Sequence, residues 1–418
     1  MKNFLEIDSN NLKNSTLVLD IDGTIVSDKS NKIKYKIVEK IKELAHKNKI
    51  YLCSNGSQSR VAKFAEVLNA SVIEGKKPFS VKMPEIKKES KIVVIGDKYL
   101  TDGLFARSIN AEFLKVRHLT SNTDTTFIKF SYFMDNLVYS TILYFKLMRP
   151  WQWVKNLFIF APLFFAGTTL VVREFFPALL AFFTFSLASS CVYIFNDIRD
   201  EKSDALHPKK KNRPIAAGLI PKSKAWVALC VLIIGTILFS MFVAQIILPL
   251  ILYLSLNALY SWKLKHIVIL DIIVVSIFYL LRLMAGGLAT GVPLSPWIII
   301  CVFFGALFII LGKRRAEHAQ ENRRSVLEDY SVEALNFMLG ISASLAIITY
   351  GIWSVIEHDS PYLVYSTIFV VFVFFKILNK IYTHTKEVES PEIMVFKDKW
   401  ILSTFLIWLI YVFFVFYI

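Results

Sequence analysis

The stretch Tyr193-Ile-Phe-Asn196-Asp197-Ile-Arg-Asp200-Glu-Lys-Ser-Asp204 ends an apolar segment with an asparagine and three aspartates. The aspartates have the spacing D-x-x-D-x-x-x-D, so on a helix they share one face at positions i, i+3 and i+7. Carboxylates this close repel one another unless a cation lies among them. Mg²⁺ takes hard oxygen ligands and often bridges to phosphates. We therefore expect these four side chains to form a Mg²⁺ site; a solvated acidic turn is the alternative.

The apolar segment before this stretch is one of nine. Of the 418 residues, 55% are apolar and 19% are charged, against about 45–50% and about 25% in soluble domains. This composition argues against an ordinary soluble enzyme and excludes disorder. A membrane-spanning helix needs about 20 apolar residues. Residues 149–418 are expected to form an all-α polytopic membrane domain with about nine spans, near 154–172, 176–195, 224–243, 245–261, 267–288, 296–312, 333–355, 361–379 and 399–417.

The distribution of lysine and arginine predicts the orientation of these spans. The connections after the second, fourth, sixth and eighth spans contain twenty of these residues, and the four other connections contain one, Arg173. Basic loops stay in the cytoplasm, so the acidic cluster is expected there and the carboxyl terminus outside. This bias accounts for much of the net charge of +15. We expect the protein in the inner (cytoplasmic) membrane. A nucleic-acid partner is not expected.

Further charged residues lie at the cytoplasmic edges or inside a span. Asp271 and Arg282 fall within the fifth span, where ionisable groups are costly and functional by default. Arginine binds phosphate oxygens in a bidentate manner and lysine acts as a point charge. Together with the acidic cluster these cations indicate a metal–polyphosphate site. The candidate phosphate-binding residues are Lys155, Arg213, Lys265, Arg282, Lys313 and Arg314.

Residues 1–120 have the pattern of a separate α/β domain. Short apolar strands near 16–21, 50–53, 91–95 and 111–116 alternate with helices near 32–48 and 60–68. This order predicts a Rossmann-like parallel sheet, with ligands at the carboxyl ends of the strands. Met1–Asn14 lacks the apolar core of a signal peptide, so we expect this domain in the cytoplasm.

Residues 121–148 are expected to join the two domains. Five apolar side chains lie roughly on one helix face, Phe127, Phe130, Phe133, Leu137 and Tyr144. This pattern predicts an interfacial helix; a plain linker helix is the alternative.

Polar motifs follow the strands of the α/β domain. The first strand leads into Asp20-Ile-Asp22-Gly-Thr24, which places two carboxylates on the same side of a strand end. One carboxylate can attack phosphorus while the other transfers protons. The later strands and the chain between them contribute Ser54-Asn55-Gly56, Lys77-Pro78 and Gly96-Asp97-Lys-Tyr-Leu-Thr-Asp102.

This ordered set over about 15–120 resembles the haloacid dehalogenase-like phosphatases, especially their small cap-less branch. The resemblance implies that Asp20 is the nucleophile and Asp22 the acid and base. It implies that Ser54, Asn55 and Lys77 bind the phosphoryl group. Mg²⁺ would lie among Asp20, Asp22, Asp97 and Asp102. A degenerate domain kept as a scaffold is the alternative.

The membrane half resembles the UbiA-type superfamily of intramembrane prenyltransferases, over roughly 146–418. The N-D-x-x-D-x-x-x-D element is specific, and in the family it binds Mg²⁺ and diphosphate. R-P-W-Q-W-V-K-N from Arg149, H-P-K-K-K-N-R-P-I-A-A-G from His207 and G-K-R-R-A-E from Gly312 look like its decaprenyl-phosphate phosphoribosyltransferase branch. The second acidic motif of the family usually holds two acidic residues, whereas Val275 stands near Asp271 here.

This resemblance implies that polyprenyl phosphate is the nucleophile and that phosphoribosyl pyrophosphate (PRPP) is the donor. Asp197, Asp200 and Asp204, with Asn196 and Asp271, would hold the metal. The phosphatase domain would then remove the ribose 5-phosphate, so the sequence predicts a bifunctional enzyme.

Other functions remain open from the sequence. One is an aromatic prenyltransferase that uses a prenyl diphosphate, and another is a transporter or membrane scaffold. In a third, the phosphatase domain acts on a different substrate, such as PRPP itself. A homo-oligomer is also compatible with the sequence.

Overall fold

The computed structural model describes residues 3–28, 30–81, 91–121, 124–167, 172–208, 210–318, 325–357, 360–383 and 398–417. The chain folds as two compact units, residues 1–144 and 145–418. Helix α4, Thr126–Met148, begins in the first unit and ends in the second. The expected division at 120 and 148 gave this helix to a linker, whereas most of it groups with the first unit.

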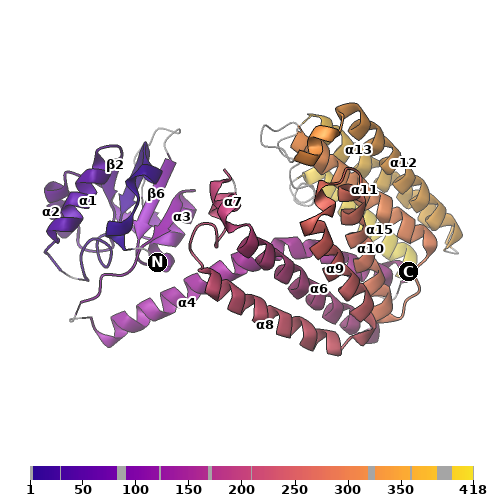
Figure 1. The fold of residues 1–418 in the computed structure, drawn as a ribbon, viewed down its shortest axis with the longest axis horizontal. Helices are drawn as coiled ribbons and strands as arrows, with labels where there is room; N and C mark the ends of the chain where they lie inside the picture. The colour runs from indigo at the N-terminus through magenta and orange to yellow at the C-terminus, as the bar shows by residue number, and fades with distance from the viewer. Residues whose placement is uncertain are drawn as a thin grey trace. The chain divides into compact units, whose positions relative to one another are not determined.

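The first unit contains a five-stranded parallel sheet (Figure 1). The strand order is β3-β2-β1-β6-β7, with bounds Ser71–Val72, Lys49–Leu52, Ser15–Leu19, Lys91–Gly96 and Glu112–Lys115. The four expected strands are present; the two-residue β3 and the hairpin β4–β5, Gly75–Lys76 and Ser80–Val81, were not expected. A Rossmann-like α/β sheet is therefore confirmed.

Helices cover both faces of this sheet because side chains along a strand alternate between faces. Leu17 and Leu19 of β1 pack with the apolar faces of α1, Tyr35–Ala45, and α2, Gln58–Leu68. Val18, between them, packs with Phe105 of α3, Leu104–Ser108. Short segments complete the unit, namely η1 Phe4–Glu6, η2 Ser9–Leu12 and the π-helical η3 Tyr99–Gly103.

The second unit is a bundle of apolar helices. Eight helices in the described part of the chain are long and apolar enough to cross a membrane, so this is a multi-pass membrane protein. Their bounds are α6 Val172–Arg199, α8 Lys222–Met241, α9 Ile247–Trp262, α10 Leu270–Thr290, α11 Pro296–His318, α12 Val332–Ile356, α13 Thr367–Thr383 and α15 Lys399–Tyr417. Shorter elements connect them: α5 Ala161–Phe165, α7 Glu201–Leu206, η5 Lys210–Asn212, η6 Ala244–Ile246, η7 Leu264–His266, η8 Ser325–Asp329 and η9 Leu363–Ser366.

The expected span at 154–172 takes a different form. Its described residues form the 3₁₀ helix η4, Pro150–Phe160, followed by the short α5; residues 168–171 lie outside the described ranges. Pro162 lacks an amide hydrogen, and its ring interferes with an α-helical carbonyl four residues earlier. The expectation of a regular helix here is therefore wrong for the described residues.

Helix α10 lies at the centre of the bundle, with residues in both large apolar clusters (Figure 1). Its Gly286 lies directly against the backbone of η4, and a Cβ atom there would come within 2.1 Å of the Ile159 carbonyl oxygen. The glycine therefore permits the close approach of η4 and α10.

We expect Gly286→Ala to destabilise the protein by about 1–3 kcal/mol, because overpacking forces the backbone to shift. The measurement is thermal unfolding of the purified protein in detergent. Gly340→Ala on α12 is the control, since a Cβ there meets nothing within 4 Å. Equal melting temperatures for the two variants would contradict this packing.

Candidate functional sites

The acidic cluster lies where α6 ends. Asp197 is 3% exposed, and its Oδ1 accepts hydrogen bonds from Arg149 Nη2 at 2.5 Å and Arg213 Nη1 at 3.1 Å. The same Arg213 nitrogen donates to Asp204 Oδ2 at 2.5 Å. Asp197 Oδ2 is buried and has no hydrogen-bond partner among the described residues. A buried carboxylate oxygen without a partner fits a metal ligand.

Asp200 lies in a more exposed environment than Asp197. α6 ends at Arg199 and α7 begins at Glu201, so Asp200 lies at the break between two helices and pairs with Arg199 at 2.9 Å. Its side chain is 38% exposed. Helical hydrogen bonds from the Asp200 amide to the Asn196 carbonyl and from the Asp204 amide to the Asp200 carbonyl, each at 2.8 Å, continue across this position. The structure brings Asp197 and Asp204 together through Arg213.

Arg282 is buried in the bundle with neutral partners. Its Nε donates to Asn156 Oδ1 at 2.6 Å, and its Nη2 donates to the Tyr253 hydroxyl at 3.3 Å. The guanidinium carbon also lies 4.8 Å from the Tyr253 ring centroid. No carboxylate of the described residues forms an ion pair with Arg282, so this buried cation suits an anionic ligand.

Asp271 is fully buried, and both of its oxygens are engaged by protein groups. Oδ2 accepts from Arg314 Nε and Oδ1 from the Tyr330 hydroxyl, each at 2.8 Å. Arg314 also pairs with Glu317 at 2.7 Å and contacts the Tyr260 hydroxyl at 3.2 Å. Asp271 was expected to bind metal, but the structure pairs it with Arg314. Arg314 was expected to bind phosphate and instead lies in this network.

We expect Asp271→Asn to destabilise the protein by about 3–5 kcal/mol, because it leaves the buried Arg314 charge undercompensated. Adding Arg314→Gln should restore part of the loss. The measurement is thermal unfolding of both single variants and the double variant in detergent. If Asp271→Asn leaves the melting temperature unchanged and alters only the Mg²⁺ dependence, Asp271 is a metal ligand and the ion-pair role is wrong.

The other candidate cations of this unit lie in three elements. Lys155 is in η4, Lys265 in η7 and Lys313 in α11, and each is half-buried. The sequence reasoning missed the acidic cluster's Arg149, although the R-P-W-Q-W-V-K-N stretch contains it. It also missed Asn156, Tyr253 and Tyr330, which partner buried charges only after folding.

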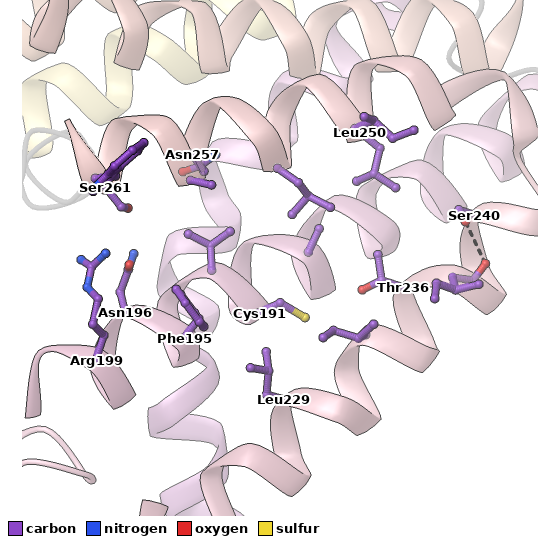
Figure 2. Close-up of a pocket in the computed structure, with 18 of the residues that line it drawn as sticks. Cys191, Phe195, Asn196, Arg199, Leu229, Thr236, Ser240, Leu250, Asn257 and Ser261 are labelled. Carbon is purple, nitrogen blue, oxygen red and sulfur yellow. Dashed lines mark hydrogen bonds between the residues drawn. The ribbon is translucent and has the colours of Figure 1, made fainter. Parts of the chain in front are cut away.

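An apolar cavity of about 710 Å³ lies between α6, α8 and α9. Figure 2 shows Asn196, Arg199, Asn257 and Ser261 at one end of it, with Cys191, Leu229 and Leu250 along its length. Asn196, an expected metal ligand, therefore lines this cavity. It directly precedes Asp197 in the sequence. The arrangement suits a molecule with a polar head and a hydrocarbon tail.

The α/β unit gathers a second set of charged groups at the end of β1. Lys77 Nζ donates to Asp20 Oδ1 at 2.5 Å and also to Asp102. Asp20, Asp97 and Asp102 each bring one oxygen within 4.8 Å of the others, and all three are buried. Thr24 Oγ1 donates to Asp20 at 3.3 Å or to Asp97 at 3.4 Å. Three buried carboxylate oxygens at this spacing fit Mg²⁺.

Burial dominates the electrostatics here. It raises the pKa of the Asp20 and Asp102 carboxyls, and the Lys77 ammonium opposes that rise. Burial alone would lower the pKa of Lys77, but the Asp102 and Asp20 carboxylates raise it above its usual range. Desolvation raises the pKa of the neighbouring Cys53 to about 11, so the thiol is neutral at pH 7.

Asp22, Ser54 and Asn55 lie at the same strand ends with partners of their own. Asp22 Oδ2 accepts from Ser54 Oγ at 3.4 Å and from Arg60 Nη1 at 2.8 Å. Asn55 binds the backbone of Lys77 through both ends of its amide, at 2.7 and 3.1 Å. Asn55 was expected to bind phosphate, whereas here it positions Lys77. Arg60 was missed by the sequence reasoning.

A helical membrane bundle with an acidic cluster, several arginines and an apolar cavity defines a class of intramembrane enzyme that handles lipids. Residues 156–396 match the UbiA prenyltransferase family. The chain belongs to this family, and within it the chain is close to the decaprenyl-phosphate phosphoribosyltransferases.

The decaprenyl-phosphate phosphoribosyltransferase of Mycobacterium tuberculosis is 39% identical over 224 residues, which cover 51% of this chain and 74% of the relative. That of Mycolicibacterium smegmatis is 36% identical and covers 50% and 69%. A solved UbiA homologue from Archaeoglobus fulgidus, bound to GPP and Mg²⁺, superposes with a TM-score of 0.52 at 16% identity. It covers 66% of this chain and 100% of the homologue, and shows the shared fold.

Proposed function

We propose that the membrane unit transfers 5-phosphoribose from PRPP to polyprenyl phosphate, and that the α/β unit then removes the 5-phosphate. The names of the relatives at 39% and 36% identity support the first step. The observation that carries the transfer step is the set of ion pairs at the end of α6. Arg149 and Arg213 both pair with Asp197, and Arg213 also pairs with Asp204. The other Asp197 oxygen has no hydrogen-bond partner among the described residues. These carboxylates and guanidiniums suit a metal–diphosphate complex.

The transfer forms one bond and breaks another. A lipid phosphate oxygen attacks the anomeric carbon of the donor, and the bond from that carbon to diphosphate breaks, so diphosphate leaves with the electron pair. When bound, Mg²⁺ would neutralise the diphosphate charge. Arg149 and Arg213 would bind the diphosphate oxygens, and fixed cations there stabilise the charge that develops on the leaving group. Asp197, with Asp204, Asp200 and Asn196 nearby, would hold the metal.

The network around Asp271 disfavours the prenyl-diphosphate alternative. A second metal site would need free carboxylate oxygens, but Arg314 and Tyr330 engage both oxygens of Asp271, and Val275 supplies none. Arg282 is assigned to the anionic lipid phosphate. Lys155 is assigned to it as well, because Lys155 directly precedes Asn156, the hydrogen-bond partner of Arg282. Lys265 and Lys313 remain candidate phosphate ligands at the ends of their helices.

The apolar cavity is assigned to the hydrocarbon chain of the acceptor. Its polar end is formed by Asn196 and Arg199, beside the proposed metal site in the sequence, and the rest of its lining is mainly apolar. We expect Ala258→Trp, which narrows the cavity, to reduce transfer to long polyprenyl phosphates about tenfold more than to a two-isoprenoid analogue. The measurement is kcat/KM for both acceptors, with Gly340→Ala as control. Equal losses for both acceptors would contradict this assignment.

The α/β unit is proposed to be a haloacid dehalogenase-like phosphatase. An Asp20 oxygen would attack the phosphorus of the ribose 5-phosphate, and the sugar oxygen would leave with a proton from Asp22. Water would then hydrolyse the aspartyl phosphate, with Asp22 accepting its proton. Lys77 would neutralise the phosphoryl group, Ser54 would bind it, and Asp20, Asp97 and Asp102 would hold Mg²⁺. The buried cluster of these carboxylates around Lys77 supports this role.

The protein is proposed to lie in the inner membrane with both sites on its cytoplasmic side. The basic connections after α6, α9, α11 and α13 support this orientation, and place the carboxyl terminus outside. The amino-terminal unit shares that side if the chain crosses the bilayer between 150 and 171, through η4 and α5.

The donor distinguishes this proposal from its alternatives. The purified protein in lipid nanodiscs receives Mg²⁺, polyprenyl phosphate and either PRPP labelled in the ribose or a labelled prenyl diphosphate with an aromatic acceptor. We expect label in the lipid fraction only with PRPP. Label in the aromatic product would establish the aromatic prenyltransferase, and label in neither product from folded protein would contradict a transferase with these substrates.

A further inference from the structure

The buried face of α4 belongs to the α/β unit and fixes how this helix is oriented. Asp135, which is 1% exposed, accepts hydrogen bonds from the amides of Tyr99 at 3.0 Å and Leu100 at 2.7 Å, and pairs with Lys115. Tyr139 lies one turn further on, with its ring centroid 5.5 Å from that of Tyr99. A buried carboxylate with three donors holds the helix in one rotation about its axis.

A second contact lies one turn earlier on the same face. The Tyr132 ring stacks on His118, with centroids 3.6 Å apart, and His118 Nδ1 lies 2.8 Å from Asp97 Oδ2. Lys98 Nζ lies 4.1 Å from the Tyr132 ring centroid. Tyr132 and Asp135 therefore contact Lys98, Tyr99 and Leu100, which lie between Asp97 and Asp102 in the chain.

The opposite face of α4 is apolar and exposed. Its side chains lie at i, i+3, i+6, i+7 and i+10, which places them on one side of the helix. We call this the aromatic face; its members are Phe127, Phe130, Phe133, Met134 and Leu137, which are 79%, 59%, 63%, 37% and 50% exposed. Because the buried face is bound to the α/β unit, the helix cannot rotate to hide these residues.

We propose that the aromatic face of α4 lies in the interface of the lipid bilayer that the membrane unit spans. Contiguous apolar side chains of this size mark an interaction surface. The bilayer is the partner that the chain itself indicates, because α4 leads through Arg149 directly into η4 and the first membrane segments. The exposed Lys129 borders the face and suits anionic lipid headgroups.

The test places a nitroxide on the aromatic face of the full chain. Phe130→Cys is labelled in a background with Cys230→Ser, because Cys230 is the one exposed cysteine of the chain. The protein is reconstituted at one chain per nanodisc of phosphatidylcholine and phosphatidylglycerol. Power-saturation curves report how often the nitroxide collides with oxygen, which concentrates in the bilayer, and with a water-soluble nickel chelate. The two collision frequencies are compared. Lys36→Cys, on the exposed side of α1, is the matched control.

We expect oxygen to raise the half-saturation power of the nitroxide at 130 more than the nickel chelate does, and the nitroxide at 36 to show the reverse. Leu137→Cys, two turns further on, provides an independent position and should behave like Phe130→Cys. Equal nickel accessibility at 130, 137 and 36 in folded protein would overturn the proposal. In proteoliposomes, spin–spin broadening between copies at 130 would show that a second chain covers the face, which would also overturn it.

Discussion

Asp197→Asn is expected to lower ribosyl transfer to polyprenyl phosphate by about 10²-fold or more, a loss typical of removing one preorganised electrostatic group. Asparagine keeps the volume of the side chain but removes its charge. The carboxylate at 197 is the group that Arg149 and Arg213 share, and its second oxygen is buried and has no hydrogen-bond partner in the described part of the chain. The variant should therefore lose both the metal ligand and the arrangement of the two arginines.

The rate is measured from labelled PRPP incorporated into lipid at saturating Mg²⁺. Asp398→Asn is a matched control, because Asp398 is also ion-paired at a helix end, with Lys380 at 2.7 Å, but it directly precedes α15 and is not part of the acidic cluster. It should keep transfer close to that of the wild type. Equal rates for Asp197→Asn and wild type would contradict a catalytic role for the end of α6.

Asp20→Asn is expected to stop the reaction at the 5-phosphorylated lipid while transfer proceeds at its normal rate. The amide cannot attack phosphorus as the carboxylate does, so release of phosphate should fall by several orders of magnitude. The change also removes one of the two carboxylates that face Lys77. The measurement is the ratio of phosphorylated to dephosphorylated lipid product by mass spectrometry.

Asp8→Asn serves as the control for this second site. Asp8 is an exposed residue that precedes η2 and accepts from the Asn10 amide at 2.9 Å, away from the carboxylate cluster. It should leave both steps unchanged. If Asp20→Asn and wild type give the same lipid products, the α/β unit acts on another substrate and only the transferase step survives.

The sequence predicted the elements more fully than it predicted their partners. Short apolar runs that alternate with helical patterns identified the parallel sheet, and runs of about 20 apolar residues identified eight of the spans, because these signals depend on neighbouring residues. The 3₁₀ geometry of η4 was not visible in such a pattern, although Pro150 and Pro162 were available as a signal. The sequence pattern also did not show that the Asp200 side chain is exposed and pairs with Arg199.

Charged partners far apart in the chain could not be predicted in this way. Asp271 meets Arg314 and Tyr330 across 43 and 59 residues, and Arg282 meets Asn156 across 126. The motif identified Asp271 as a candidate ligand, but only the packing of α10 against α11 and η8 shows that its oxygens are already engaged. Asn55 is similar, since its role depends on where the backbone of Lys77 lies.

The central claim is that both units act in sequence on one lipid, and the mass of the lipid made from PRPP and polyprenyl phosphate tests it most directly. The wild-type protein should give polyprenyl phosphate extended by one unphosphorylated pentosyl group. A 5-phosphorylated product should appear early, decline later, and persist when Asp20 is replaced with Asn. A wild-type product that retains its 5-phosphate throughout would contradict the sequential account, and the absence of any ribosylated lipid from folded protein would contradict the transfer itself.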